Sequence, residues 1–380
     1  VEAAIAAWAD GAGEQPLNEL YDALMALPVA PSFPYVEPSD LPAIRAARPP
    51  AAAALPRLAD DAAAADRFLG AWLGRSAGCA LGKPLEAGPF MGGGCGNPGW
   101  RNVQLWFEGA DAWPISGYTP EHSRAEANPG LHIGSYSLPC TREHIRYMQT
   151  DDDIRYTVLG LVMLEERGLD FDTWDVGKLW HSRLTYGQVC TAETQAYLNF
   201  SQVTSHMHRE RPADAEERLA WVRTYRNPYR EWIGAQIRAD GWAYAAAGNP
   251  ELAAELAWRD AALSHVKNGI YGEMFAAAMI AAAFVEPDPA AIVAAGLAQI
   301  PARCRLAEAV VQAVEMARTA TSQTDLVSRL WDALGHYHPV HTINNAALVA
   351  AALVYAAGDF ETAIATAVLG GWDTDCNGAT

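Results

Sequence analysis

Residues Gly272–Phe284 have the sequence GEMFAAAMIAAAF, in which most positions are Ala, Met or Phe. Ala and Met are strong helix formers, and an apolar run of this kind predicts a buried helix. Helix starts are indicated at Asn249-Pro250 and Asp288-Pro289, where a cap residue precedes proline. No run of alternating β-branched residues stands out, so we predict an all-α fold. Apolar residues at three- and four-residue spacing predict four further helices: Glu251–Val266, Arg305–Thr319, Gln323–Leu334 and Asn345–Ala356.

The composition indicates a globular and acidic protein. Hydrophobic residues make up 51% of the 380 residues and charged residues 19%, which is typical of a chain with a large core. The formal net charge is -18, so nucleic-acid backbones and anionic membranes repel the chain. We therefore expect neither a membrane nor duplex nucleic acid as a partner, and we expect multivalent cations as ligands.

Cysteine spacing and the apolar runs favour a cytoplasmic protein. The six cysteines include no Cys-x-x-Cys pair, and a disulfide scaffold is not expected in a chain of this length. The N-terminus carries Glu2, Asp10 and Glu14 and lacks the basic start and apolar core of a signal peptide. The longest apolar runs, Met274–Val285 and Ala346–Ala357, are too short to span a bilayer. We expect a monomer.

The chain is predicted to comprise an N-terminal extension or linker, residues 1–60, and a helical domain, residues 61–380. Within the extension, Pro31–Pro56 is rich in Pro and Ala, as linkers are. Residues 87–149 contain many Gly, Pro and aromatic residues and show little helical periodicity. An irregular stretch of this length inside a compact domain is usually functional, so we predict an irregular insertion that acts as a lid. The alternative is an elaborated surface loop.

The first acidic cluster is Thr150-Asp151-Asp152-Asp153, which precedes the apolar-periodic run Ile154–Leu164. One interpretation is a helix N-terminus, where Thr or Asp caps the first turn and the helix dipole favours carboxylates. Three consecutive carboxylates exceed what a cap needs, and their mutual repulsion calls for a counter-charge. The cluster is therefore also a candidate cation site.

The second acidic cluster is Asp373-Thr374-Asp375, preceded by Gly370 and Gly371. In an extended or turning segment, residues two positions apart lie on the same side. The glycines permit backbone conformations that other residues avoid. The alternative is a turn in which the aspartates act only as caps.

Together the clusters supply up to five carboxylates and two threonine hydroxyls, with no histidine pair at zinc spacing. These hard oxygen donors favour Mg²⁺, Mn²⁺ or Ca²⁺ over Zn²⁺. Two ions about 3.5–4 Å apart could share one carboxylate and hold a water between them. We predict two Mg²⁺ ions, with Mn²⁺ as a substitute, and five metal ligands: Thr150, Asp151, Asp152, Asp373 and Asp375.

At this point the sequence resembles the ADP-ribosylglycohydrolases, which include the enzyme that reactivates dinitrogenase reductase. The markers of that family are an early Gly-rich helix ending in Glu, a Thr-Asp-Asp motif and a late Gly-Gly-Asp-Thr-Asp-Thr motif. The resemblance extends over residues 66–86 and 150–380. The markers correspond, in the same order, to Arg67–Gly74 with Gly78–Glu86, Thr150–Asp152 and Gly370–Cys376.

The resemblance implies a compact orthogonal helical bundle around a dinuclear Mg²⁺ centre. It implies a hydrolase that cleaves the N- or O-glycosidic ribosyl bond of an ADP-ribosylated protein or small molecule. Family members contact ADP-ribose through a Gly-x-x-Met-Arg segment, and they place a histidine near the ribose or phosphate. The corresponding substrate-binding residues are Gly234, Gln236, Ile237, Arg238 and His265.

The resemblance also implies catalytic roles for carboxylates. Glu86 corresponds to the family glutamate, which implies a gate that contacts metal or substrate. A water attacking the anomeric carbon would pass through an oxocarbenium-like state. Glu86, Asp152 and Asp375 are the carboxylates predicted to transfer protons during that attack. Aromatic residues of the insertion are expected to stack on adenine.

The sequence departs from the family pattern at a few positions. Cys376 replaces the second Thr of the late motif, which helps to bind metal in the family, and Trp372 is inserted before Asp373. Ile237 replaces the Met of the substrate segment, and Ile233 replaces an Asn common before its Gly. Relatives usually continue into another helix, which implies that the protein extends beyond residue 380.

Three alternatives remain for the function. The first is a glycohydrolase of another ribosyl or nucleoside-like compound, which shares the metals and differs in the pocket. The second is a non-catalytic, crystallin-like relative; the intact carboxylates argue against it. The third, an isoprenoid synthase, needs an Asp-Asp-x-x-Asp motif, and Arg155 stands at its last position.

Overall fold

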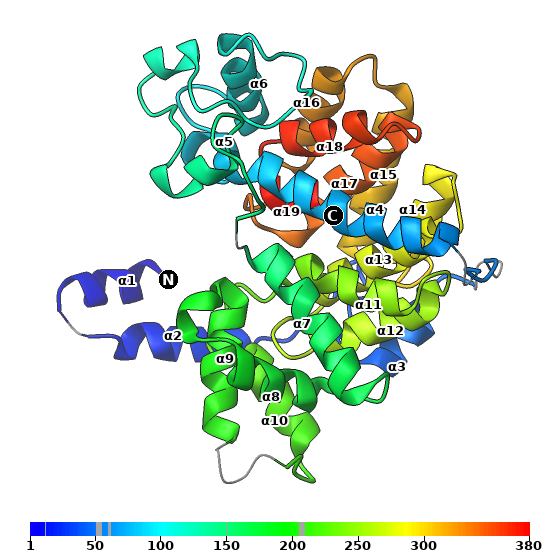
Figure 1. Ribbon diagram of the computed structural model, residues 1–380. Helices are drawn as coiled ribbons and strands as arrows, with labels where there is room; N and C mark the ends of the chain where they lie inside the picture. The colour runs from blue at the N-terminus through cyan, green and yellow to red at the C-terminus, as the bar shows by residue number, and fades with distance from the viewer. Residues whose placement is uncertain (12, 51–54, 60–61, 150, 205–209) are drawn as a thin grey trace. The chain divides into compact units, whose positions relative to one another are not determined.

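The computed structural model describes residues 1–11, 13–50, 55–59, 62–149, 151–204 and 210–380. These residues form α- and 3₁₀-helices, and strand pairing among them is limited to isolated bridges between Gly94 and Asn97 and between Trp232 and His341. The predicted all-α fold is therefore confirmed (Figure 1). Two compact units can be distinguished, Val1–Tyr35 and Val36–Thr380.

The first unit contains α1 (Glu2–Ala9) and α2 (Gln15–Met25). The second begins with α3 (Leu41–Ala47), α4 (Ala62–Gly82), η1 (Lys83–Leu85), α5 (Gly88–Gly92), α6 (Gly99–Gly109), η2 (Arg124–Ala127) and η3 (Ser135–Cys140). It continues with α7 (Asp152–Arg167), α8 (Thr173–Arg183), η4 (Tyr186–Gln188), α9 (Thr191–Val203), α10 (Ala215–Thr224), η5 (Ile233–Arg238), α11 (Ala239–Ala245) and α12 (Pro250–Ala261). It ends with α13 (Asn268–Ala283), α14 (Pro289–Leu297), α15 (Arg305–Thr319), α16 (Gln323–Leu334), α17 (Thr342–Ala356), α18 (Phe360–Leu369) and α19 (Thr374–Ala379).

All five predicted helices are present, and two of them have the expected bounds at both ends. The helices α15 and α16 begin and end at the predicted residues. The predicted caps are present, because Asn249 accepts a hydrogen bond from Leu252 N at 3.2 Å and Asp288 accepts one from Ala290 N at 3.1 Å. The helix α12 stops before the predicted end, since the chain then turns through Lys267, whose φ is 47°.

The helix α13, which contains the GEMFAAAMIAAAF run, lies between two hydrophobic clusters. On one side Met274 and Phe275 pack in a cluster with residues of α6, α15 and α17. On the other side Ala276 and Ala277 belong to a cluster with residues of α7, α8 and α11. A helix that is apolar all round is suited to burial on every side. In the described part of the chain, no helix is both long enough and apolar enough to cross a membrane.

The stretch 87–149 contains more helix than the sequence analysis predicted. The helix α6 spans Gly99–Gly109 and buries Val103, Trp106 and Phe107. Their spacing of three and four residues is helical, but the surrounding Gly and Pro residues masked this short pattern. The rest of the stretch is largely irregular and includes the short helices α5, η2 and η3.

The glycines of the early motif allow α4 and α19 to pack backbone against backbone. A Cβ atom added at Gly78 would overlap the carbonyl group of Gly378, and one added at Gly82 would overlap the backbone of Thr374. Thr374 also donates a hydrogen bond from Oγ1 to Gly82 O at 2.8 Å. This close approach places the late acidic cluster at the C-terminal end of α4.

Candidate metal centre

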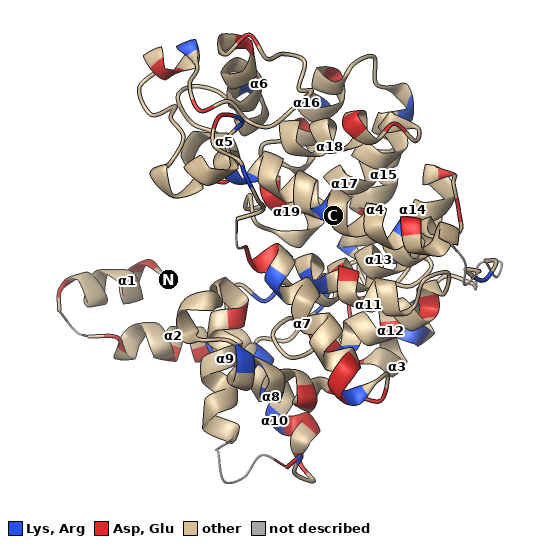
Figure 2. Cartoon of the chain, in the orientation of Figure 1, with Lys and Arg blue, Asp and Glu red and all other residues tan. Residues whose placement is uncertain are grey.

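Carboxylates from three distant segments meet at one place. Asp151 caps the N-terminus of α7, Asp373 precedes α19, Asp375 lies in the first turn of α19, and Glu86 follows η1. Figure 2 shows acidic residues at the starts of α7 and α19. Asp375 is helical and not in an extended or turning segment, because α19 already begins at Thr374.

Two groups of possible ligands share Asp375. In the first group, one ligand atom from each residue lies within 4.8 Å of all the others, and its members are Cys79, Asp151, Asp153 and Asp375. The second group meets the same condition and consists of Asp373, Asp375 and Cys376. Every member of both groups is buried. We call the two groups together the carboxylate centre.

The predicted metal ligands are only partly represented in these groups. Asp151, Asp373 and Asp375 belong to them. Asp152, the first residue of α7, is half-buried and belongs to neither. Thr150 lies outside the described residues. The ligand roles of all five residues remain predictions.

In the first group, basic side chains already contact the carboxylates. The Lys83 ammonium contacts Asp151 Oδ2, and Asp151 Oδ1 accepts a hydrogen bond from Asp153 N at 3.1 Å. Arg75 Nη2 lies 3.4 Å from Asp153 Oδ1, and Arg75 Nη1 lies 2.7 Å from Asp240 Oδ2. Burial alone would lower the pKa of Lys83, but Asp375 and Glu86 raise it, so Lys83 is a cation.

The buried carboxylates repel one another when no cation is bound. Burial raises the pKa values of Asp153 and Asp373 well above their usual range, and the charge of Asp375 raises both further. Burial also raises the pKa of Asp375, although Lys83 opposes this effect. A bound cation would stabilise these three carboxylates, because a positive charge favours their ionised forms.

Three carboxylate oxygen atoms of the centre are available to bind a cation. Asp153 Oδ2, Asp373 Oδ1 and Asp375 Oδ1 are buried and have no hydrogen-bond partner. A buried charged oxygen without a partner is costly, so native proteins usually pair it or coordinate it to a metal. Burial keeps the thiols of Cys79 and Cys376 neutral by raising their pKa well above normal. Carboxylate oxygens therefore remain as donors, and they suit a hard divalent ion.

Glu86 lies at the rim of the centre, next to the irregular insertion. Burial raises its pKa well above normal, Asp375 and Asp373 raise it further, and its carboxyl group forms a hydrogen bond with Asp375. Tyr136, in η3 of the insertion, donates a hydrogen bond from its hydroxyl to Glu86 O at 3.1 Å, and the residue is 53% exposed. The insertion thus presents an accessible aromatic ring beside a carboxyl group that can hold a proton.

The predicted substrate segment forms η5, and its arginine is occupied by internal partners. Arg238 is 1% exposed, with Nη1 2.6 Å from Glu193 Oε1 and Nε 2.5 Å from Asp260 Oδ2. Its guanidinium also lies 5.0 Å from the ring centroid of Trp180. A diphosphate would have to replace these buried contacts to reach Arg238. Its substrate-binding role remains a prediction.

The other predicted substrate residues also face the interior. His265 is fully buried, its Nδ1 lies 2.8 Å from Ser264 Oγ, and burial lowers its pKa well below normal. Gln236 and Ile237 are buried, and a Cβ added at Gly234 would meet Glu193 Oε2 at 2.6 Å. Their roles as substrate contacts remain predictions.

Three residues of the site that the sequence analysis did not select lie along one side of the early motif. Arg75, Cys79 and Lys83 are spaced four residues apart, which places them on one face of a helix. This spacing could have identified the three residues as one side of the site from the sequence. Asp153 was also visible in the first cluster, but nothing in the sequence distinguished it from Asp152 as the buried member.

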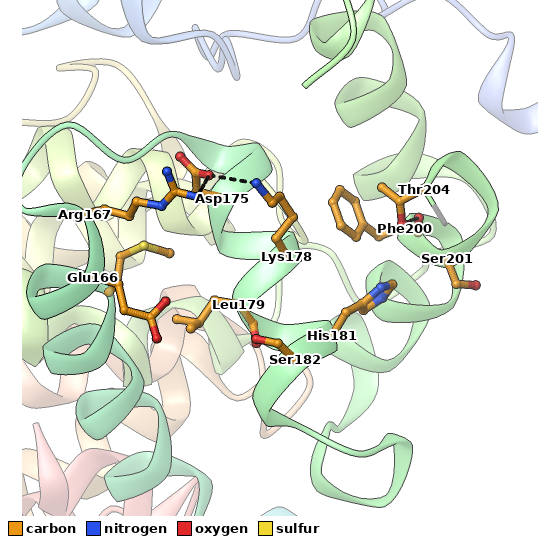
Figure 3. A pocket seen from close by; sticks show the side chains of 11 residues that line it. Glu166, Arg167, Asp175, Lys178, Leu179, His181, Ser182, Phe200, Ser201 and Thr204 are labelled. Atoms are coloured by element: carbon orange, nitrogen blue, oxygen red, sulfur yellow. Dashed lines mark hydrogen bonds and ion pairs between the residues drawn. The ribbon is translucent and has the colours of Figure 1, made fainter. Parts of the chain in front are cut away.

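A separate hollow lies between α7, α8 and α9, as Figure 3 shows. Its charged side chains already have partners, because Arg167 and Lys178 each lie 3.5 Å from Asp175 and Glu166 pairs with Arg183. No member of the carboxylate centre lines this hollow. We therefore place the functional site at the carboxylate centre.

Comparisons with known proteins agree with the geometry of the site. The family profile described as ADP-ribosylglycohydrolase matches residues 60–380. Neither the search of curated proteins nor the search of solved structures found a match. The profile spans all three segments that form the carboxylate centre, and it covers most of the sequence. The chain belongs to the ADP-ribosylglycohydrolase family.

Proposed function

We propose that this protein is a Mg²⁺-dependent hydrolase that cleaves the ribosyl bond of an ADP-ribosylated protein or small molecule. The observation that carries the proposal is the set of unpaired, buried carboxylate oxygens on Asp153, Asp373 and Asp375. These atoms lie at the junction of motifs that are far apart in the sequence. Membership of the family supports a glycosidase that acts on ADP-ribosyl groups.

Asp373 and Asp375 are the residues that would hold the divalent cation. Both are nearly inaccessible to solvent, at 3% and 2% exposure, and the backbone N–H of Asp373 donates to Asn345 Oδ1 at 3.1 Å. The same Asn345 oxygen accepts a hydrogen bond from Asn377 Nδ2 at 2.7 Å. This network fixes the start of α19. A cation held there would supply positive charge to orient the ribose hydroxyl groups.

Glu86 is the residue best placed to transfer a proton. Burial and the charges of Asp375 and Asp373 raise the pKa of Glu86 well above normal, which favours its protonated form, and its position at the rim gives it access to a bound substrate. In glycoside hydrolysis a carboxyl group protonates the leaving group or removes a proton from the attacking water. The neighbouring charges of Asp152 and Asp375 would stabilise positive charge that develops on the ribose ring.

Tyr136 would form part of the substrate site. Its ring is exposed and is anchored by the hydrogen bond to Glu86 O. An aromatic ring in this position can stack on adenine or on the ribose face. The insertion would then contribute to binding, in line with the lid predicted from the sequence.

A substrate panel tests the proposal. Release of ADP-ribose or ribose should be measured from ADP-ribosyl-arginine, ADP-ribosyl-serine and simple ribosides, with Mg²⁺ and with a chelator. We expect Mg²⁺-dependent release from at least one ADP-ribosylated compound. Release only from simple ribosides would favour the nucleoside-type alternative. Absence of release from every compound, with the fold intact, would favour a non-catalytic relative.

A further inference from the structure

The two groups of the carboxylate centre differ in their positive charges. In the first group, Lys83 contacts Asp151 and Arg75 lies 3.4 Å from Asp153. In the second group, within the described residues, neither Asp373 nor Asp375 forms an ion pair with a basic side chain. Fixed cations therefore occupy only one half of the centre.

We infer that the Lys83 ammonium takes the place of one of two metal ions, so that the centre binds a single divalent cation, at Asp373 and Asp375. This inference rests on the proposed function, because it presupposes that a divalent cation binds at the centre. It replaces the two-ion arrangement expected from the sequence with one ion and one lysine.

The contacts of Asp151 support this assignment. One of its oxygens contacts the Lys83 ammonium and the other accepts the Asp153 backbone N–H. Both oxygens are thus engaged, and Asp151 has no unpaired buried oxygen to offer an ion. Asp153, the other carboxylate specific to the first group, keeps one unpaired oxygen, but its Oδ1 already lies 3.4 Å from Arg75 Nη2. In the second group, Asp373 Oδ1 and Asp375 Oδ1 are buried and unpaired, and neither residue forms an ion pair with a basic side chain among the described residues.

The position of Lys83 shows that its charge is directed into the centre. The residue is 9% exposed and lies in η1, directly after the glycines that bring α4 against α19. A buried lysine without a counter-charge is strongly unfavourable, and Asp151 supplies the counter-charge here. A divalent ion in the first group would have to displace the ammonium from Asp151 and would stand close to its charge. Like charges at such a distance repel strongly in a buried site.

The soft donors in the centre do not change this conclusion. Cys79 belongs to the first group and Cys376 to the second, so each group holds one thiol. Neutral thiols are poor ligands for Mg²⁺ and Mn²⁺, which prefer oxygen. The number of bound ions therefore depends on the carboxylates and on Lys83.

The test is the stoichiometry of Mn²⁺ binding to the full chain, measured by calorimetric titration and by electron paramagnetic resonance. We expect one Mn²⁺ per chain for the parent, with the spectrum of an isolated ion. Lys83→Met removes the charge and keeps an unbranched side chain of similar length. This variant should bind two ions per chain, with a spectrum broadened by their interaction.

Lys178→Met is the matched control, because Lys178 also pairs with an aspartate but belongs to the separate hollow. It should bind one ion, as the parent does. Two ions in the parent, or one ion in a folded Lys83→Met variant, would overturn the inference about Lys83. One bound ion without hydrolysis of any ADP-ribosylated compound would instead overturn the proposed function. Absence of binding would overturn both.

A second pair of variants keeps the inference testable if Lys83→Met does not fold. Asp151→Asn should retain the single ion with an affinity within a few-fold of the parent, because Asp151 is held by Lys83. Asp373→Asn should lose the ion. Loss of binding in Asp151→Asn, with circular dichroism unchanged, would show that the ion lies in the first group.

Discussion

Two substitutions of identical chemistry in α4 should have opposite effects on stability. A Cβ atom added at Gly78 would overlap the carbonyl group of Gly378 and would lie 3.2 Å from Ala379 N. A Cβ added at Gly70, in the same helix, would meet nothing within 4 Å. Comparing Gly78→Ala with Gly70→Ala therefore distinguishes the cost of disturbing the close packing of α4 on α19 from the general effect of alanine in a helix.

The expected magnitudes follow from these two environments. Replacing glycine by alanine inside a helix stabilises by about 0.5–1 kcal/mol, and Gly70→Ala should show this gain. Relieving the overlap at Gly78 requires backbone movement, and overpacking of this kind costs about 1–3 kcal/mol. Because backbone atoms cannot rotate away as a side chain can, the upper part of that range applies, and Gly78→Ala should lose about 2 kcal/mol net.

Urea unfolding followed by circular dichroism measures the difference. The midpoint should fall for Gly78→Ala and rise for Gly70→Ala, with similar slopes. Gly78→Ala should also weaken Mn²⁺ binding, because it displaces the helix that carries Asp375, whereas Gly70→Ala should not. Shifts of both midpoints in the same direction would refute the argument from the α4–α19 contact.

Three further predictions concern single side chains. Cys376→Thr should keep the fold and bind Mg²⁺ at least as tightly as the parent in calorimetric titration, because burial keeps the thiol neutral; clearly weaker binding would count against this. Tyr136→Ala should raise KM more than it lowers kcat, because the ring is exposed beside Glu86, and an unchanged KM would exclude a role in binding. Burial raises the pKa of Glu193 from 4.5 to about 7. Between these values the folded chain holds a proton that the unfolded chain has released, so the free energy of unfolding falls as the pH rises from about 4.5 to about 7. Glu193→Gln should flatten that decline in urea titrations at several pH values; an unchanged slope would contradict the assignment.

The sequence was sufficient for features that depend on local pattern. The ends of α15 and α16 follow from apolar spacing and caps, and the all-α fold follows from the Ala-rich runs. The helix α6 was missed because its apolar spacing is short and lies among Gly and Pro residues. Local pattern is weakest where an element is short and is stabilised mainly by tertiary contacts.

The site was harder to predict, because its charges are paired through tertiary contacts. That the two acidic clusters form one site could be predicted, because both supply the hard oxygen donors that a divalent cation prefers. The pairing of Lys83 with Asp151 and of Arg75 with Asp240 joins residues far apart in the sequence, and residue types alone do not define such pairs. The same holds for Arg238, whose internal partners are Glu193 and Asp260.

The most direct test of the account is the rate of ADP-ribose release at saturating Mg²⁺ for the parent, Asp373→Asn and Asp332→Asn. Asp332 is exposed on α16 and provides the matched control for loss of a single carboxylate charge. We predict that Asp373→Asn lowers the rate by at least about 100-fold, because it removes a charge that holds the cation, and that Asp332→Asn leaves the rate unchanged. A folded Asp373→Asn variant that releases ADP-ribose at the parent rate would contradict the claim that this centre binds the cation used in the reaction.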